Sequence, residues 1–388
     1  MNVDEVISRR ELLRRGGLVA GTLSLGGLLA ACGSEPPAEG GGGPTGQTGA
    51  SPSPQSIEGA RIKVSTYGGF FEENFAKMYP AFTEETGVEV ESIAEPTSEA
   101  WVVQLQQAID SGAPPPSDVS MLSGVGIQRA IKGDILVTFD QAAIPQATNL
   151  AEGYIRTDAS GLVAGVGGVS WYITLVSNTD RVAESPDSWT TFWDTQWENE
   201  LALLKNAANS YLIETTAACF FGGYDILETQ DGVVEVLTKL QELKPNVKLW
   251  YRDEAQAQQA FNTGEVSIGQ FYHDITTYAA SQGEPLRSVF PTEGAILDSG
   301  FWAISKTVEN VAACQAFIDY MCRPDIQAEL ARTLGTTPTA KQETMDLSAE
   351  EYEAVGGPGP DAALRPKYEM YDEWEDWIDQ QWTEMILS

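Results

Sequence analysis

Residues 61–94 read RIKVSTYGGFFEENFAKMYPAFTEETGVEVESIA, and this stretch decides the fold class. Apolar and polar side chains alternate over residues 61–66, as they do in a strand with one buried face. Apolar side chains then follow at helical spacing, namely Phe71, Phe75, Met78 and Phe82. Gly87 stands where a helix C-cap is expected, and residues 88–94 alternate again. A strand, a helix and a second strand in this order predict a parallel β-α-β unit, and therefore an α/β fold.

The same order of elements recurs later in the chain. Residues 254–274, EAQAQQAFNTGEVSIGQFYHD, predict a polar helix, an Asn-Thr-Gly stop and a strand that ends close to Asp274. Residues 114–124, PPPSDVSMLSG, predict another short strand with Ser123 at its carboxyl end. Because ligands bind at the carboxyl ends of strands in open α/β sheets, Tyr67, Ser123 and Asp274 are candidate binding residues.

The amino-terminal segment predicts export. Residues 8–13 read SRRELL, a twin-arginine pattern, and residues 16–29 form an uncharged apolar stretch that is too short to span a bilayer. The segment ends in Leu-Ala-Ala-Cys at Cys32, which resembles the lipobox of bacterial lipoproteins. We therefore expect residues 1–31 to be a signal peptide and Cys32 to be lipidated. An ordinary cleaved leader with a chance cysteine is the alternative.

Residues 32–57 form a segment rich in Gly, Pro, Ser and Thr. Such a segment cannot bury enough apolar surface to offset the entropy lost on ordering, so we expect a disordered tether that starts at Cys32. The remaining residues, 58–388, exceed what one hydrophobic core usually supports, and two lobes are expected.

The chain is strongly acidic, with 56 Asp and Glu against 23 Lys and Arg and a net charge of −33. Such a surface repels nucleic acid and anionic lipid and favours cationic partners. The same excess also arises from selection for solubility, for example in a salty habitat, so it does not identify a site.

The cysteines allow two interpretations in an oxidising compartment. With Cys32 set aside, Cys219, Cys314 and Cys322 remain. Cys314 and Cys322 lie in one expected helix, about 12 Å apart along its axis, which is beyond disulfide reach. Either one disulfide joins Cys219 to one of these two, or all three are free thiols.

The sequence contains few residues suited to catalysis or to metal binding. The chain has 1 His, His273, which excludes a zinc site built from several imidazoles. No G-x-S-x-G motif and no cysteine in a catalytic context accompany His273. We therefore expect no enzyme activity, no metal and no cofactor. The enzymatic alternative is an exported carboxylate-based glycosidase, to which the 10 Trp and many acids would be suited.

Aromatic side chains and carboxylates gather near the expected sheet edge. Tyr67 follows the first strand, and Asp298 lies among apolar neighbours in residues 290–306. Trp171 and Tyr172 lie at the start of a strand-like run, where alternation lets only one of them face a site, and we favour Tyr172. Aromatic rings attract an organic ammonium by cation–π contact, and a buried carboxylate adds a charge-assisted hydrogen bond. These residues, together with the aspartate at position 274, predict a cage for an amine.

Four segments carry a resemblance to a known family. They read VSTYGGFFEENFAKMYPAFTEETGVEV, GGVSWYITLVSNTDRV with the following SPDSWTTFWD, FNTGEVSIGQFYHD, and FPTEGAILDSGFWAISKTVENVAACQAFIDYMCRPDIQAELARTLGTTPT. Their order resembles the extracellular solute-binding proteins of ABC importers, specifically the spermidine/putrescine-binding type. The resemblance implies a two-lobed periplasmic-binding-protein-like fold of type II that closes over a ligand in the cleft between the lobes. It also implies a monomer that delivers a polyamine to a membrane permease and catalyses nothing.

The resemblance assigns roles to individual residues. Asp274 and Asp298 match the two aspartates that hold the polyamine, and Phe271 matches an aromatic that precedes the first. His273 then has no role. We place the first lobe in residues 58–165 plus 273–330 and the second in residues 166–272 plus 331–388.

Three positions depart from the family pattern. The first strand-helix turn reads Thr-Tyr-Gly-Gly-Phe at residues 66–70 in place of an Asn-Trp pair. Residues 336–338 replace an expected aromatic, and Asn206, Asn209 and Tyr211 stand where some members have acids. Backbone N–H groups at the Gly-Gly turn favour an anion, so a zwitterionic ω-amino acid or a betaine is the alternative ligand, and a neutral sugar is a further one.

Overall fold

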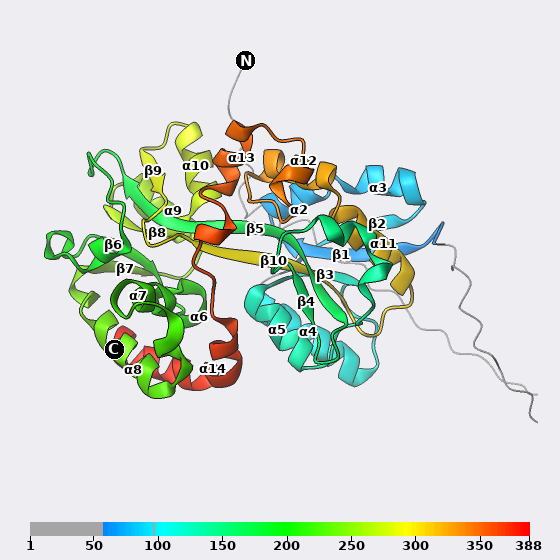
Figure 1. Ribbon diagram of the computed structural model, residues 1–388, viewed down its shortest axis with the longest axis horizontal. Coiled ribbons are helices and arrows are strands. Elements are labelled where there is room, and N and C mark those ends of the chain that lie inside the picture. The colour runs from blue at the N-terminus through cyan, green and yellow to red at the C-terminus, as the bar shows by residue number, and fades with distance from the viewer. Residues whose placement is uncertain (1–56, 96–97) are drawn as a thin grey trace, which may run out of the picture. The chain divides into compact units, whose positions relative to one another are not determined.

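The computed structural model describes residues 57–95 and 98–388, and within them one mixed sheet of 10 strands (Figure 1). The hydrogen-bonded order is β2-β1-β3-β10-β5-β8-β6-β7, and β4 and β9 also pair with β5. The strands are β1 (Arg61–Tyr67), β2 (Glu89–Glu95), β3 (Val119–Ser123), β4 (Ile155–Thr157), β5 (Val163–Asn178), β6 (Leu201–Leu204), β7 (Val247–Tyr251), β8 (Ile268–Tyr272), β9 (Leu286–Val289) and β10 (Ile296–Ile304).

Helices surround this sheet. They are α2 (Phe70–Phe75), α3 (Tyr79–Thr86), α4 (Ser98–Ser111), α5 (Gly124–Lys132), α6 (Ala207–Ser210), α7 (Leu212–Phe220), α8 (Gln230–Gln241), α9 (Glu254–Asn262), α10 (His273–Ser281), α11 (Val311–Met321), α12 (Pro324–Leu334), α13 (Ala349–Gly356) and α14 (Tyr368–Trp382). None of the helices in the described part of the chain is long and apolar enough to cross a bilayer.

Two strands connect the halves of the sheet. The 16-residue β5 pairs antiparallel with both β10 and β8, and β10 also pairs antiparallel with β3. One half therefore contains β2, β1 and β3, and the other contains β8, β6 and β7. Each half has its own large hydrophobic cluster, one around Met121, Trp302 and Phe317 and the other around Leu203 and Leu237.

The predicted β-α-β unit is confirmed at both strands and corrected at the helix. β1 and β2 are parallel, and Gly87 ends the helix with φ 72° and a backbone N–H that donates to the Thr83 carbonyl at 2.8 Å. The predicted single helix is in fact two, α2 and α3, because Pro80 has no N–H to donate to the carbonyl of residue 76.

The carboxyl-terminal segment crosses the connecting strands. Residues 357–367, which we call the crossing segment, run beside β10, where the Leu364 backbone bonds to the Ala295 carbonyl and the Leu297 N–H, both at 2.9 Å. The chain then forms α14, which packs Met370, Ile378 and Trp382 into the second hydrophobic cluster.

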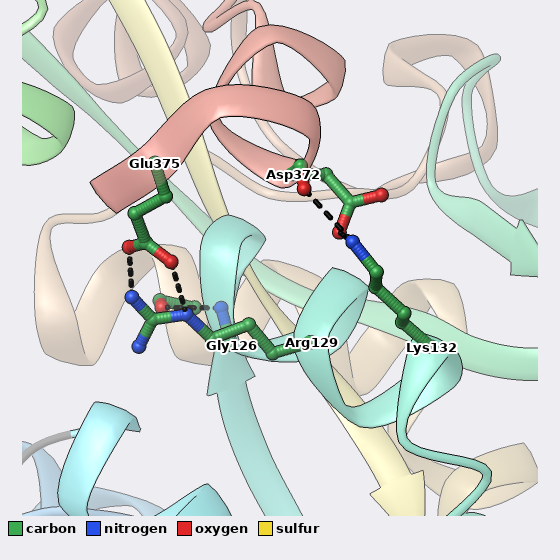
Figure 2. A network of polar contacts seen from close by, with 6 residues as sticks. Gly126, Arg129, Lys132, Asp372 and Glu375 are labelled. Atoms are coloured by element: carbon green, nitrogen blue, oxygen red, sulfur yellow. Dashed lines mark hydrogen bonds and ion pairs between the residues drawn. The ribbon is translucent and has the colours of Figure 1, made fainter. Parts of the chain in front are cut away.

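Helix α14 also contacts α5, which belongs to the first half (Figure 2). Glu375 accepts from the Arg129 guanidinium at two atoms, one of them Nε at 3.1 Å. The Lys132 ammonium lies 3.3 Å from the Asp372 carboxylate and donates to its backbone carbonyl at 2.9 Å. These ion pairs join an element packed on the second half to an element packed on the first.

The described cysteines are free thiols. Cys314 and Cys322 are buried in the first cluster, and Cys219 is half-buried beside the second. Of the two interpretations that the sequence left open, the structure supports the free thiols. Cys32, the signal peptide and nearly all of the tether lie outside the described residues.

Candidate functional site

A cavity of about 1,000 Å³ joins elements from distant parts of the sequence. The turn after β1, helix α9, the start of α10, the end of α12 and helix α13 contribute to its wall. Wall residues include Gly68, Phe71, Glu254, Asp274, Arg332 and Glu353. The cavity therefore lies at the carboxyl ends of β1 and β8, the edge that the sequence indicated.

Asp274 is the buried carboxylate of this wall. It lies in the first turn of α10, with a side chain that is only 9% exposed. Burial raises its pKa to about 7, and the hydrogen bond from the Ile275 backbone N–H offsets part of that rise. Its Oδ1 has no hydrogen-bond partner among the described residues. A buried carboxylate oxygen without a donor is costly, and a ligand ammonium would satisfy it.

His273 has both ring nitrogens occupied. Nε2 lies 3.1 Å from the Ala354 carbonyl, and Nδ1 lies 2.8 Å from the Ser288 hydroxyl. The carbonyl can only accept, so Nε2 carries the proton and Nδ1 accepts from Ser288. Burial lowers the pKa of His273, which keeps the ring neutral. The histidine thus fixes α10 to α13 at the cavity edge and offers no free nitrogen for chemistry.

The cavity wall carries more negative than positive charge. Glu254, Glu351 and Glu353 line it together with the carboxylate of Asp274, whereas Arg332 is its one guanidinium within the described residues. Arg332 is itself paired with Glu351 at 2.8 Å. The wall therefore has an excess of acid, which favours a cation over an anion.

The turn after β1 contributes backbone and aromatic surface to the same cavity. Gly69 has φ 67°, a conformation that glycine adopts readily, and Gly68 lines the wall. The Tyr67 ring makes edge contacts with Phe71 at 5.7 Å and with Trp171 at 5.8 Å between ring centroids. Tyr67 thus supports the wall residue Phe71, and Trp171, rather than Tyr172, is the ring beside it.

Asp298 is not among the residues of the cavity wall, and both of its carboxylate oxygens accept hydrogen bonds. The hydroxyl of Tyr211 donates to Oδ2 at 2.5 Å, the hydroxyl of Tyr368 donates to Oδ1, and the Ser299 N–H donates to Oδ1 at 2.7 Å. The side chain is 3% exposed, and burial raises its pKa against the opposing effect of these hydrogen bonds. The structure does not bring Asp298 and Asp274 to one cavity, and a role for Asp298 in ligand binding stays a prediction.

Three further candidates also lie outside the cavity wall. Tyr172 is 1% exposed and packs against Phe290 at 5.0 Å between ring centroids. Phe271 is equally buried, in the apolar cluster that contains Phe261. Ser123 begins α5, where its hydroxyl accepts from the Gly126 N–H at 3.2 Å. Ligand contacts by these residues stay predictions.

Sequence reasoning did not identify the part of the wall that α12 and α13 supply. Arg332, Glu351 and Glu353 lie in ordinary amphipathic helices, and nothing in their local pattern distinguishes them from solvated charges. The one available signal was Gly335, a C-cap with φ 69° that lets the chain turn beside Asp274.

Comparison with known proteins gives a family-level result. Residues 77–354 match the model of a family described as bacterial extracellular solute-binding protein. A γ-aminobutyric acid-binding protein of Pseudomonas aeruginosa is 28% identical over 184 residues, which are 46% of this chain and 50% of that protein. Spermidine/putrescine-binding periplasmic protein 1 of Haemophilus influenzae is 25% identical over 279 residues, 70% of this chain and 73% of that protein.

Solved structures give the same result for the fold. A spermidine/putrescine ABC transporter substrate-binding protein from Streptococcus pneumoniae has a TM-score of 0.71 at 20% identity, covering 84% of this chain and 99% of that one. The structure of a GABA receptor has a TM-score of 0.70 at 20% identity, covering 83% and 96%. These similarities confirm the predicted two-lobed α/β fold.

Proposed function

This chain belongs to the bacterial extracellular solute-binding protein family, and on that premise we propose that it binds a small organic cation and delivers it to an ABC permease. The observation that carries the proposal is the Asp274 carboxylate, buried at the wall of a cavity of about 1,000 Å³ with Oδ1 lacking a partner among the described residues. A primary ammonium supplies both the missing donor and the compensating charge.

The rest of the wall favours more than one ammonium group on the ligand. Glu254 and Glu353 lie on the same cavity as Asp274, and Arg332 is already paired with Glu351. A diamine or polyamine such as putrescine or spermidine can meet the buried aspartate with one end and the acidic wall with the other. The 25% identity to a spermidine/putrescine-binding protein supports this ligand class.

A zwitterionic ω-amino acid is the second candidate, for two reasons. The same cavity contains the Gly68 turn and Arg332, where a ligand carboxylate could bind while the ammonium binds Asp274. The γ-aminobutyric acid-binding relative, at 28% identity, supports this alternative. Betaines and neutral sugars remain weaker alternatives, because neither offers an N–H donor of full positive charge to the aspartate.

Capture would proceed by closure of the two halves around the ligand. The cavity wall takes Gly68 from the first half and Asp274 from the start of α10, which follows β8 of the second half, whereas the lobe bounds expected from the sequence placed residues 273–330 in the first lobe. A ligand that bridges the two stabilises the closed arrangement over the open one, and the permease would recognise the closed form. As part of the same proposal, residues 1–31 direct export, Cys32 anchors the protein by lipid to the outer face of the cytoplasmic membrane, and the protein acts as a monomer.

Isothermal titration with putrescine, spermidine, γ-aminobutyrate, glycine betaine and a sugar tests the ligand class. Asp274→Asn should weaken the amine that binds by about 10- to 150-fold, because a hydrogen bond to a charged group contributes about 1.5 to 3 kcal/mol. Asp231→Asn is the matched control, since Asp231 is also an aspartate in the first turn of a helix, α8, but is exposed.

Each outcome of this titration decides something specific. Binding of di- or polyamines that only Asp274→Asn weakens supports the cationic ligand. Binding of γ-aminobutyrate and of none of the other compounds would indicate a zwitterionic ligand, with its carboxylate bound near Arg332. Amine affinity that is equal in the wild type, Asp274→Asn and Asp231→Asn would remove the aspartate from the site.

A further inference from the structure

A second cavity, of about 380 Å³, lies on different elements from the first. It is formed by the loop before β4, by β4 itself, by β10, by the end of the crossing segment and by the first residues of α14. Its wall includes the charged residues Glu152, Arg156, Arg365, Lys367 and Glu369, together with Ser299 and Tyr368. Whereas acids outnumber bases on the wall of the first cavity, the second cavity has three cationic side chains, Arg156, Arg365 and Lys367, against two acids, Glu152 and Glu369.

Two guanidinium groups of this wall are held by aromatic rings instead of carboxylates. The Arg156 guanidinium carbon lies 4.8 Å from the Phe301 ring centroid and 5.6 Å from that of Tyr368. The Arg365 guanidinium carbon lies 5.7 Å from the Tyr154 ring centroid. Stacking on a ring fixes the plane of a guanidinium and leaves its N–H edge available to a planar or tetrahedral oxyanion.

Neither of these arginines has an ion pair in the part of the chain that the structure describes. Arg156 Nε is moreover buried without a hydrogen-bond partner there. Lys367 differs, because its ammonium pairs with Glu228. In a chain with 56 acids for 23 basic residues, two stacked arginines at one cavity that form no ion pair among the described residues are an unusual feature, the more so because Glu152 and Glu369 line the same cavity.

Charge compensation of Asp298 is the simplest other role for Arg156. Arg156 does lower the pKa of that carboxyl, by a smaller effect than the hydrogen bonds from Tyr211 and Tyr368. The Asp298 oxygens are, however, already occupied by these two hydroxyls and by the Ser299 N–H. A long-range interaction with the Asp298 carboxylate therefore accounts for the positive charge of Arg156. It does not supply a hydrogen-bond acceptor for the Arg156 Nε.

We propose that the second cavity binds a small oxyanion, of the carboxylate or phosphate class, between Arg156 and Arg365. Arg156 lies on β4 and Arg365 in the crossing segment, so the anion would be held by two elements that are far apart in sequence. Each guanidinium can donate two parallel N–H bonds to one oxyanion. The bound anion would thereby fasten the crossing segment, and the start of α14 that follows it, to β4.

The test is isothermal titration of the full chain with phosphate, sulfate and succinate at constant ionic strength, with chloride as the competing salt. We expect saturable binding of at least one of the three, weakened at least tenfold by Arg365→Gln and by Arg156→Gln. Arg252→Gln is the control, because Arg252 also has no ion pair among the described residues and lies outside this cavity. Phosphate or sulfate as the tighter ligand assigns the phosphate class, and succinate assigns the carboxylate class.

Two results would overturn the proposal. One is the absence of saturable binding for all three anions, and the other is binding that Arg365→Gln leaves unchanged. Arg156 lies near Asp298, so Arg156→Gln could fail to fold. In that case the anion affinity of Arg365→Gln alone tests the proposal. The inference does not depend on the ligand of the first cavity, and Arg365→Gln should leave amine affinity within about twofold of the wild type.

Discussion

Asp274 and Asp298 are two buried aspartates that the sequence placed in one site, and of the two only Asp274 lines the cavity of about 1,000 Å³. Both are less than 10% exposed, and burial raises the pKa of each. They differ in their partners, since Asp298 accepts from Tyr211 and Tyr368 whereas Asp274 Oδ1 has no partner in the described part of the chain. A buried carboxylate therefore indicates a binding site only when its donors are missing.

The two aspartates accordingly have different physical roles. Tyr211 precedes α7, and Tyr368 begins α14 with its ring packed where Gly124 of α5 has no side chain. Asp298, on the connecting strand β10, thus gathers hydroxyls from elements that pack on both halves. It stabilises this arrangement in the absence of ligand, whereas Asp274 weakens the ligand-free fold and gains its partner on binding.

Asp298→Asn should produce the largest effect on stability and little effect on binding. An amide offers one acceptor fewer to the two tyrosine hydroxyls, so we expect the free energy of unfolding to fall by about 1 to 3 kcal/mol. Amine affinity should stay within about threefold of the wild type. Urea unfolding and titration calorimetry on the same preparation measure both quantities, with Asp274→Asn alongside.

The pattern for Asp274→Asn should be the reverse, with affinity lost and the free energy of unfolding unchanged or raised. If Asp298→Asn weakens amine binding as strongly as Asp274→Asn does, the ligand reaches both aspartates. The site that the resemblance implied would then be correct, and the separation in this structure would belong to one conformation only.

Amine affinity should fall by about tenfold from pH 8 to pH 6. The pKa of Asp274 in the ligand-free protein is about 7, whereas an alkylammonium stays charged to about pH 10, so only the aspartate titrates in this range. Each unit below pH 7 then costs about tenfold in affinity, and binding near pH 7 releases protons. Titrations in buffers of different ionisation enthalpy measure that release.

The effect of Asp274 on folding has the opposite sign. Its folded pKa of about 7 lies above 3.8, the ordinary value of an aspartate, so the folded state binds the proton more tightly than the unfolded state. The stability that this group contributes is therefore full below about pH 4 and is lost as the pH rises through 7. An affinity that is flat from pH 6 to 8, or that Asp274→Asn leaves equally pH-dependent, would contradict the assignment.

Sequence alone could predict the elements of this fold but not the partners of its carboxylates. The alternation in β1, β2 and β8 and the stop at Gly87 are local signals, and they gave the β-α-β unit and placed Asp274 at the end of a strand. Pro80 is also a local signal for the break between α2 and α3. The helical spacing of apolar residues continues across Pro80, however, and this spacing led to the prediction of a single helix.

The difference between the two aspartates depends on contacts between distant residues. Asp298 is 87 residues from Tyr211 and 70 from Tyr368, and neither tyrosine lies in a pattern that points to a carboxylate. Part of the cavity wall around Asp274 likewise comes from α12 and α13. Several elements separate these helices from α10 in the sequence, so no local pattern connects them to Asp274. Only the assembled fold distinguishes a saturated carboxylate from an available one.

The smallest expected effect tests whether α14, which brings Tyr368 to Asp298, also helps to close the two halves. Arg129→Gln removes the ion pair with Glu375, in which both side chains are about one-third exposed. The free energy of unfolding should fall by about 0.5 to 1 kcal/mol, and by less in 1 M salt, because salt screens exposed charges. The control is Arg61→Gln, because the Arg61–Glu89 pair lies within the first half.

If closure uses the α5–α14 contact, Arg129→Gln should also weaken amine binding by about two- to threefold, whereas Arg61→Gln should not. Equal amine affinities in the two variants would limit the ion pair to a role in stability, and the closed state would then depend on the ligand at Asp274 alone.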